Sequence, residues 1–78
     1  MTRIYIGAGR KAGVRPNDLV GAIANEAGIS SREIGAIEIA DGFSLVEIAE
    51  ESADDVIGAL RASAIKGKRV TVRRERFE

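Results

Sequence analysis

Apolar and polar residues alternate near the start of the chain. This period of two over residues 3–7 predicts a strand that turns Ile4 and Ile6 toward a core. From residue 16 onward the period becomes that of a helix. Pro16 suits the first helical turn and Gly28 suits the left-handed residue that ends a helix. One helical face between them is apolar: Leu19, Val20, Ile23, Ala24 and Ala27.

Two further strands are expected in the middle of the chain. Residues 30–33 (SSRE) resemble a capping box and predict one short turn. Alternating apolar positions then predict strands over residues 34–39 and 43–48, and residues 40–42 (ADG) are typical of a hairpin between them. The inward positions of these strands are Ile37, Ile39, Val46 and Ile48.

A second helix and a last strand are expected toward the end of the chain. Ser52 is expected to cap this helix, whose apolar stripe consists of Ala53, Val56, Ile57 and Leu60. Residues 69–74 predict the last strand, with Val70 and Val72 turned inward.

The order of these elements is β-α-β-β-α-β, which predicts the α+β class. Right-handed crossovers place the first and last strands side by side, or nearly so, and both helices on one face of the sheet. We therefore expect one domain over residues 1–78, with a four-stranded antiparallel sheet whose other face is open. The open face is expected to present Arg3, Tyr5, Phe43, Leu45, Thr71 and Arg73.

Charge is distributed unevenly, although the formal net charge is zero. Ten of the twelve basic residues lie in residues 1–15 and 66–78, whereas ten of the twelve acids lie in residues 16–65. Because the expected fold brings the two terminal segments together, the sequence predicts one basic face and one acidic face. A basic face favours nucleic acid as the partner, since Lys and Arg neutralise phosphates.

The composition excludes several kinds of chemistry. The chain has no cysteine and no histidine, which removes disulfides, thiolate and histidine catalysis, and the common zinc sites. The absence of cysteine fits a cytoplasmic protein. The apolar runs are too short to cross a membrane, and no signal-peptide pattern opens the chain. We expect no catalytic activity, no cofactor, no bound metal and no membrane partner.

Tyr5 and Phe43 are two of the three aromatic residues and are expected on the open face. An outward ring offers a flat surface on which a base can stack, and such stacking is worth about 1–3 kcal/mol per base. Alternatively, both rings are buried under the C-terminal tail or serve only as strand formers.

The residues of two predicted strands resemble known RNA-binding motifs. Residues 4–9 (IYIGAG) resemble the six-residue motif on the first strand of RNA-recognition motifs, and residues 41–48 (DGFSLVEI) resemble the eight-residue motif on their third strand. Residues 9–23 (GRKAGVRPNDLVGAI), 34–39 (IGAIEI) and 43–47 (FSLVE) resemble, more specifically, the DbpA-like RNA-binding domain at the C-terminus of bacterial DEAD-box RNA helicases.

This resemblance implies a ferredoxin-like fold and a function in RNA binding. It implies that the module tethers an ATP-dependent helicase core in the same chain to structured RNA. In some members of the family the target is a hairpin of large-subunit ribosomal RNA, and others are broader RNA chaperones. Ribosome assembly and RNA remodelling are the implied processes.

Two residues depart from the usual motif. Asp41 stands where a basic residue usually opens the eight-residue motif, and Leu45 stands in place of its second stacking aromatic. A weaker sheet platform is therefore expected, with the glycine-rich basic loop and the last strand as the main RNA contacts. The predicted RNA-binding residues are Arg3, Tyr5, Arg10, Lys11, Arg15, Phe43, Lys68, Arg73 and Arg74.

Other interpretations of these features stay open. Residues 7–12 (GAGRKA) fit a dinucleotide-binding pattern, but the helix signal begins too late and an extended parallel sheet is lacking. ACT-like domains, which bind small molecules or pair subunits, share the same topology. Several charged residues are interpreted as solvated, the acids as favourable near a helix N-terminus: Glu50, Glu51, Asp54, Asp55, Arg32 and Arg61.

Overall fold

The computed structural model describes residues 1–63, 65, 67 and 69–75. Its strands and helices are β1 (Thr2–Ile6), α1 (Pro16–Ala27), β2 (Ile34–Ile39), β3 (Ser44–Ile48), α2 (Ala53–Ala62) and β4 (Val72–Arg74). Three short 3-10 turns lie between them: η1 (Arg10–Ala12), η2 (Ser31–Glu33) and η3 (Glu50–Ser52).

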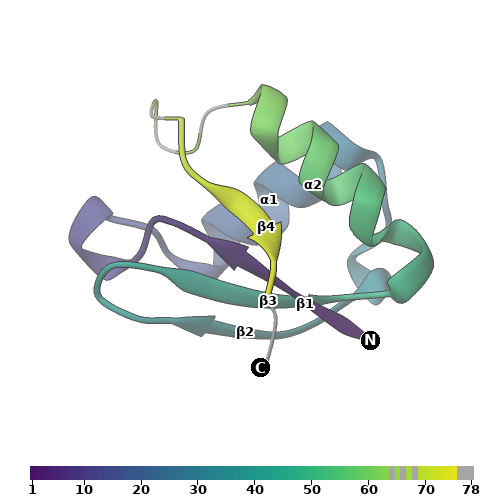
Figure 1. The fold of residues 1–78 in the computed structure, drawn as a ribbon, viewed down its shortest axis with the longest axis horizontal. Coiled ribbons are helices and arrows are strands. Elements are labelled where there is room, and N and C mark those ends of the chain that lie inside the picture. Colours follow the sequence, from purple (N-terminus) through teal and green to yellow (C-terminus); the bar gives the residue numbers. More distant parts are fainter. Residues whose placement is uncertain (64, 66, 68, 76–78) are drawn as a thin grey trace.

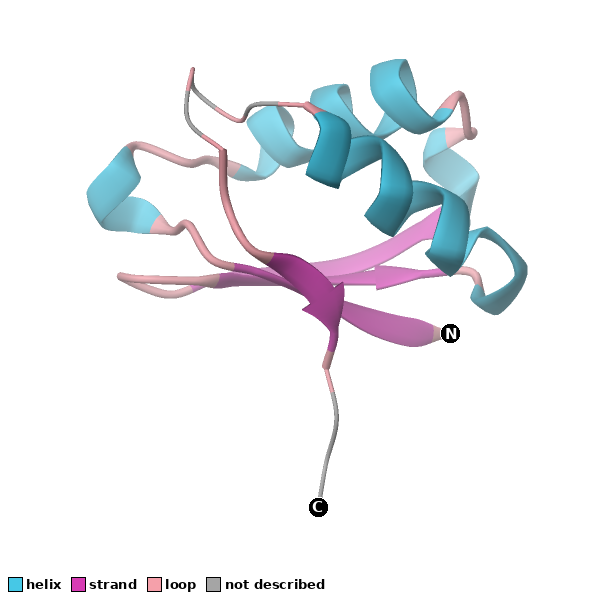
Figure 2. Ribbon diagram, turned by 45° about the horizontal axis from the view of Figure 1, so that its top comes forward, coloured by secondary structure: helices cyan, strands magenta, loops and turns pink. Residues whose placement is uncertain are grey.

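The four strands form one antiparallel sheet in the order β2-β3-β1-β4. Both helices cover one face of this sheet and leave the other face open (Figure 1, Figure 2). The predicted α+β fold, with β1 and β4 side by side, is confirmed.

The core lies between the sheet and the two helices. Its fully buried side chains come from alternate strand positions and from one face of each helix, as the sequence pattern predicts: Ile4, Ile6, Leu19, Ile23, Val46, Ile48, Val56 and Leu60. Gly28 ends α1 in the left-handed conformation at φ 68°, which confirms its predicted role. None of the helices in the described ranges is long and apolar enough to cross a membrane.

Strand β4 is shorter than the predicted strand over residues 69–74. It lies at the edge of the sheet, so only β1 can pair with it. Backbone pairing ends where the Gly7 N–H donates to the Thr71 carbonyl oxygen at 2.7 Å, because β1 ends at Ile6 and the chain then turns toward the β2–β3 hairpin. Arg69 and Val70 therefore lie outside β4, and Val70 is only half-buried.

Ser52 occupies the N-cap position of α2, as predicted, but its side chain makes no cap hydrogen bond. Its hydroxyl donates instead to Oε1 of Glu33 at 2.5 Å, while Oε2 of the same carboxylate accepts the Ser30 N–H at 3.0 Å. A hydrogen bond to a carboxylate is stronger than one to a neutral group, which explains this preference. The bond links the turn before β2 to the turn before α2.

Candidate nucleic-acid interface

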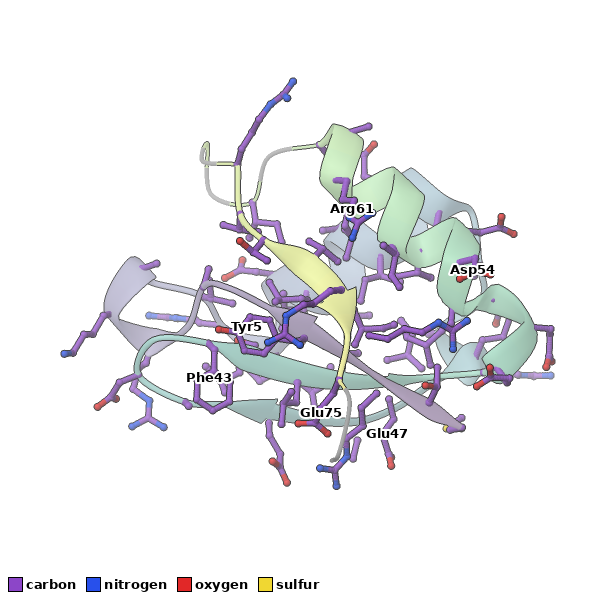
Figure 3. The ribbon with its side chains drawn as sticks, in the orientation of Figure 1. Tyr5, Phe43, Glu47, Asp54, Arg61 and Glu75 are labelled. Atoms are coloured by element: carbon purple, nitrogen blue, oxygen red, sulfur yellow. The ribbon has the colours of Figure 1, made fainter. Side chains whose placement is uncertain are left out.

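Two aromatic residues and one arginine lie together on the open face of the sheet. The rings of Tyr5 on β1 and of Phe43, directly before β3, stack with their centroids 5.6 Å apart and their planes 17° apart (Figure 3). Arg73 on β4 pairs with Tyr5 in register, and its guanidinium carbon lies 4.3 Å from the Tyr5 ring centroid. Tyr5 is therefore half-buried between two neighbours, whereas Phe43 keeps 38% of its area exposed. The sheet brings these three predicted residues together.

Leu45 lies on the same face, opposite Tyr5, as predicted. It is nevertheless only 9% exposed, because longer side chains surround it: Arg3 on β1, Glu38 on β2 and Glu47 on β3 itself. The second stacking position of the motif is thus both aliphatic and covered, and it offers little surface to a base.

The glycine-rich loop is docked on the tip of the β2–β3 hairpin. The backbone N–H of Arg10 donates to the Ala40 carbonyl at 2.8 Å, and that of Lys11 donates to the Asp41 carbonyl at 3.0 Å. This close approach requires glycine at position 9, since a Cβ there would lie 2.2 Å from the Ala40 carbonyl oxygen. The docking places the basic turn η1 beside the hairpin that leads into Phe43.

The basic side chains of this loop differ in what they contact. The Arg10 guanidinium donates to the Ile39 carbonyl at 3.0 Å and lies 3.7 Å from a carboxylate oxygen of Asp41. Asp41, which replaces the usual basic residue of the eight-residue motif, therefore contacts Arg10 of the loop. Lys11 and Arg15 are exposed, and neither side chain has a carboxylate partner within the described part of the chain. Both cations are available to an external anion.

The other half of the open face is acidic. Arg3 lies opposite Glu47 in the β1–β3 register and lies 3.5 Å from the carboxylate of Glu75, while Glu38 flanks Leu45 from β2. Figure 3 shows Glu47 and Glu75 toward the far end of the sheet from Phe43. The prediction of a basic face is therefore only partly right, because sheet register interleaves these acids with the terminal arginines.

Glu47 has a structural partner on β2. The β2–β3 register shifts between Ile34 and Ile37, and this bulge leaves the Ala36 N–H facing the Glu47 carboxylate at 3.0 Å. A Cβ on Gly35 would lie 2.9 Å from the same carboxylate oxygen, so a side chain there would push the Glu47 carboxylate aside.

Arg74 points to the helix side of the sheet, because successive strand residues face opposite ways. Its terminal nitrogens bind Asp54 at 3.0 Å and Glu50 at 2.9 Å. The hydrogen bonds to Asp54 and then to Glu50 raise the pKa of the Arg74 guanidinium above its ordinary value. Glu50 and Asp54 are largely exposed, as predicted, and in addition both hold β4 to the helix layer. Arg74 would have to exchange these partners to bind a phosphate.

Arg61 is exposed, as expected of a solvated charge, and it also makes a contact that was not predicted. Its Nε donates to the Val72 carbonyl at 2.9 Å, which joins the end of α2 to β4. Arg32 is exposed on η2, as expected. Lys68, predicted to bind RNA, lies outside the described residues.

Within the described ranges, no group of three His, Cys, Asp or Glu residues could hold a metal ion.

The structure gives no support to a dinucleotide site in the glycine-rich loop. The 3-10 turn η1 separates the loop from α1, which begins only at Pro16, and the sheet is antiparallel. The backbone N–H groups of Arg10 and Lys11 are already bonded to the hairpin, so they cannot cradle a pyrophosphate.

Known proteins are similar to this chain in sequence and in fold. The family model described as the DbpA RNA binding domain matches residues 3–74. ATP-dependent RNA helicase DbpA of Bacillus subtilis (strain 168) is 36% identical over 70 residues, which cover 90% of this chain and 15% of that protein. ATP-dependent RNA helicase DeaD of Buchnera aphidicola subsp. Schizaphis graminum is 37% identical over 68 residues, which cover 87% of this chain and 11% of that protein.

The crystal structure of RNA binding protein PG1 shows the same fold. It superposes with a TM-score of 0.72 at 24% identity and covers all of both chains. The chain therefore spans a small part of its curated relatives but the whole of one solved structure. The family match favours an RNA-binding domain over an ACT-like domain of the same topology. On the match over residues 3–74, this chain belongs to the DbpA RNA-binding domain family.

Proposed function

We propose that this chain binds RNA at the Phe43 end of its open sheet face, together with the adjoining basic loop. The observation that carries the proposal is the position of an exposed ring on the hairpin that holds Lys11. A base stacks on Phe43 and the neighbouring phosphates contact Lys11 and Arg15, whose charges have no carboxylate partner among the described residues. The membership in an RNA-binding family supports this reading.

Arg73 gives this interface a second planar surface. Its guanidinium covers the face of Tyr5, so a second base stacks on the guanidinium itself or displaces it. Both arrangements occur in RNA recognition, where aromatic rings and arginine planes stack on unpaired bases. The expected ligand is therefore RNA with unpaired nucleotides next to a region that supplies further phosphates.

In the complete protein, we propose that this domain tethers a DEAD-box helicase core in the same chain to structured RNA. The relatives DbpA and DeaD are named as ATP-dependent RNA helicases, and this chain matches a small part of each. We propose ribosomal RNA as the target and ribosome assembly or RNA remodelling as the process. ATP hydrolysis then belongs to the helicase core and not to this domain.

A binding titration over a range of salt concentrations tests the proposal. A fluorescently labelled RNA hairpin with a single-stranded uridine tail is expected to bind, with an affinity that falls as salt rises from about 50 to 200 mM. Lys11→Gln should weaken binding and flatten the salt dependence, because one neutralised phosphate is lost. Arg32→Gln removes the same charge from η2, at the other end of β2 from the hairpin, and is the control. An affinity that does not change with salt, or equal binding by Lys11→Gln and Arg32→Gln, would contradict the proposal.

The choice of ribosomal RNA is tested separately by competition. Unlabelled ribosomal RNA should displace the labelled hairpin more effectively than an equal mass of fully paired RNA duplex. Equal displacement by the two competitors would remove the proposed target while leaving RNA binding intact.

A further inference from the structure

A charged groove lies between α2 and β4, at the edge of the sheet. Its volume is about 370 Å³, and its lining contains three arginines and one acid: Asp54, Ile57, Arg61, Arg73 and Arg74. Figure 3 shows Arg61 above β4 and Asp54 further along the same helix. The lining is therefore more basic than acidic, in a chain whose net charge is zero.

Among the described residues, Arg61 and Arg73 are the arginines of this groove without a carboxylate partner, and Arg73 lies over the Tyr5 ring. Arg74 is neutralised by Asp54 and Glu50, at 3.0 and 2.9 Å. Arg61 has no carboxylate partner among the described residues, and its described hydrogen bond is made by Nε to the Val72 carbonyl. That bond anchors the side chain, and the two terminal nitrogens have no partner among the described residues. These nitrogens are the part of arginine that binds phosphate oxygens in pairs.

The groove is continuous with the interface on the open face. Arg73 lines the groove and also places its guanidinium over the Tyr5 ring. Because β4 is the edge strand, an RNA strand that crosses Phe43 and Tyr5 toward β4 meets Arg73 and then the groove. A polymer with one phosphate per nucleotide can occupy both places at once.

We propose that this groove binds a phosphate of the same RNA, with Arg61 as its main ligand. The RNA interface then continues round the β4 edge to the helix side of the domain. The inference rests on the proposed function and adds a binding site outside the open sheet face. An acidic protein segment is the competing occupant, but the continuity through Arg73 favours RNA.

Substitutions at Arg61 test the site with the same labelled hairpin. Arg61→Gln should weaken binding roughly twofold to fivefold, as expected for one exposed ion pair. It should also reduce the slope of log affinity against log salt by about 0.7, the value for one phosphate on a single strand. Arg61→Lys keeps the charge and should keep the slope, while Arg32→Gln is the control and should change neither quantity.

Arg61→Gln also removes the hydrogen bond to the Val72 carbonyl and can lower the stability of the fold, so a second variant is needed. Asp54→Asn removes the one carboxylate of the lining and one of the two acids that pair with Arg74, so it should strengthen RNA binding about twofold. The melting temperature of every variant is measured first, and affinities are compared where all of them are folded. Should Arg61→Gln not fold, Asp54→Asn decides, and an unchanged affinity in that variant overturns the inference.

The outcomes separate the groove from the proposed function. If the unmodified chain binds RNA and Arg61→Gln shows the same affinity and slope, the groove inference is overturned and the proposed function stands. If the unmodified chain does not bind RNA, the proposed function itself fails. Unchanged RNA binding by Arg61→Gln, with loss of binding to the purified helicase core of a DbpA relative, would assign the groove to a protein partner instead.

Discussion

Phe43 is the residue on which stacking should concentrate. Its ring keeps 38% of its area exposed, whereas the Tyr5 ring is covered by Arg73 at 4.3 Å. Stacking on Tyr5 would first require the loss of this cation–π contact, which is worth about 0.5–1 kcal/mol at an exposed position. A base can reach Phe43 without such a rearrangement.

Phe43→Ala should therefore lower RNA affinity by about 1–3 kcal/mol. Its melting temperature should fall less than that of Ile4→Ala, because Ile4 is fully buried and such a truncation costs about 2–5 kcal/mol of stability. Phe43→Tyr keeps a stacking surface and should bind nearly as well as the unmodified chain. Unchanged RNA affinity in folded Phe43→Ala would show that this ring takes no part in binding.

Gly9 is the residue that fixes the basic loop. In Gly9→Ala the new Cβ would lie 2.2 Å from the Ala40 carbonyl oxygen and 2.7 Å from the Phe43 nitrogen, so the loop must move away from the hairpin. We expect a loss of about 1–3 kcal/mol in the free energy of unfolding, measured by denaturant titration, together with weaker RNA binding. Gly42→Ala, in the same hairpin, meets no atom within 4 Å and is the matched control. Equal stability of the two variants would contradict this role for Gly9.

At the scale of elements, one carboxylate connects two turns. Glu33 accepts the Ser52 hydroxyl from η3 and the Ser30 N–H from its own turn, and its backbone carbonyl accepts the Ala49 N–H at 2.9 Å. The hydrogen bond from Ser52 and then that from Ser30 lower the pKa of Glu33 below its ordinary value of 4.5. These bonds are strongest to the ionised carboxylate, so the link between the turns depends on pH.

This link predicts how stability changes in acid. Because the pKa of Glu33 is lower in the folded state, its contribution is fully present above about pH 4.5 and is lost as the pH falls through the folded value. Glu33→Gln should therefore melt below the unmodified chain at neutral pH, and the gap should close in acid. Glu38→Gln, which alters an exposed carboxylate on β2, is the control. A gap in melting temperature that stays constant from neutral pH to pH 3 would contradict the prediction.

At the scale of the whole molecule, the open face is divided between two kinds of surface. The end near the hairpin carries the aromatic pair and the basic turn η1, while the other end carries Glu38, Glu47 and Glu75 around Arg3. Phosphates are attracted to the first end and repelled from the second. In the proposed interface, this division is expected to confine RNA to the hairpin end and to the β4 edge.

Neutralising the acidic end should extend the surface open to RNA. Glu38 is the suitable position, because Glu47 also accepts the Ala36 N–H at the β2 bulge. Glu38→Gln should strengthen RNA binding about twofold near 0.1 M salt, and the gain should shrink at higher salt as screening increases. Glu26→Gln, on an exposed position of α1, removes the same charge from the helix side and should have little effect. Equal changes in affinity for Glu38→Gln and Glu26→Gln would show that only the net charge matters.

The sequence by itself determined the elements of this protein and their order. Alternation over residues 3–7 and the apolar stripe of α2 are local properties, because the period of burial follows from the geometry of a single strand or helix. Local rules also placed Pro16 at the start of α1, Gly28 at its end and the capping box at η2. The motif on β1 and β3 further indicated the family that the comparison over residues 3–74 shows.

Only the tertiary structure decided which charges and polar groups meet. The partners of Arg74 lie 20 and 24 residues away, and the carboxylate that binds the Ser52 hydroxyl lies 19 residues away. Such pairs depend on strand register and on how the helices pack over the sheet, which no local pattern encodes. The same register placed Arg73 over Tyr5 and buried Leu45 on an open face. The candidate RNA-binding residues were therefore predicted from local patterns and motifs, but packing between distant segments decided which of their side chains are exposed and which already have partners.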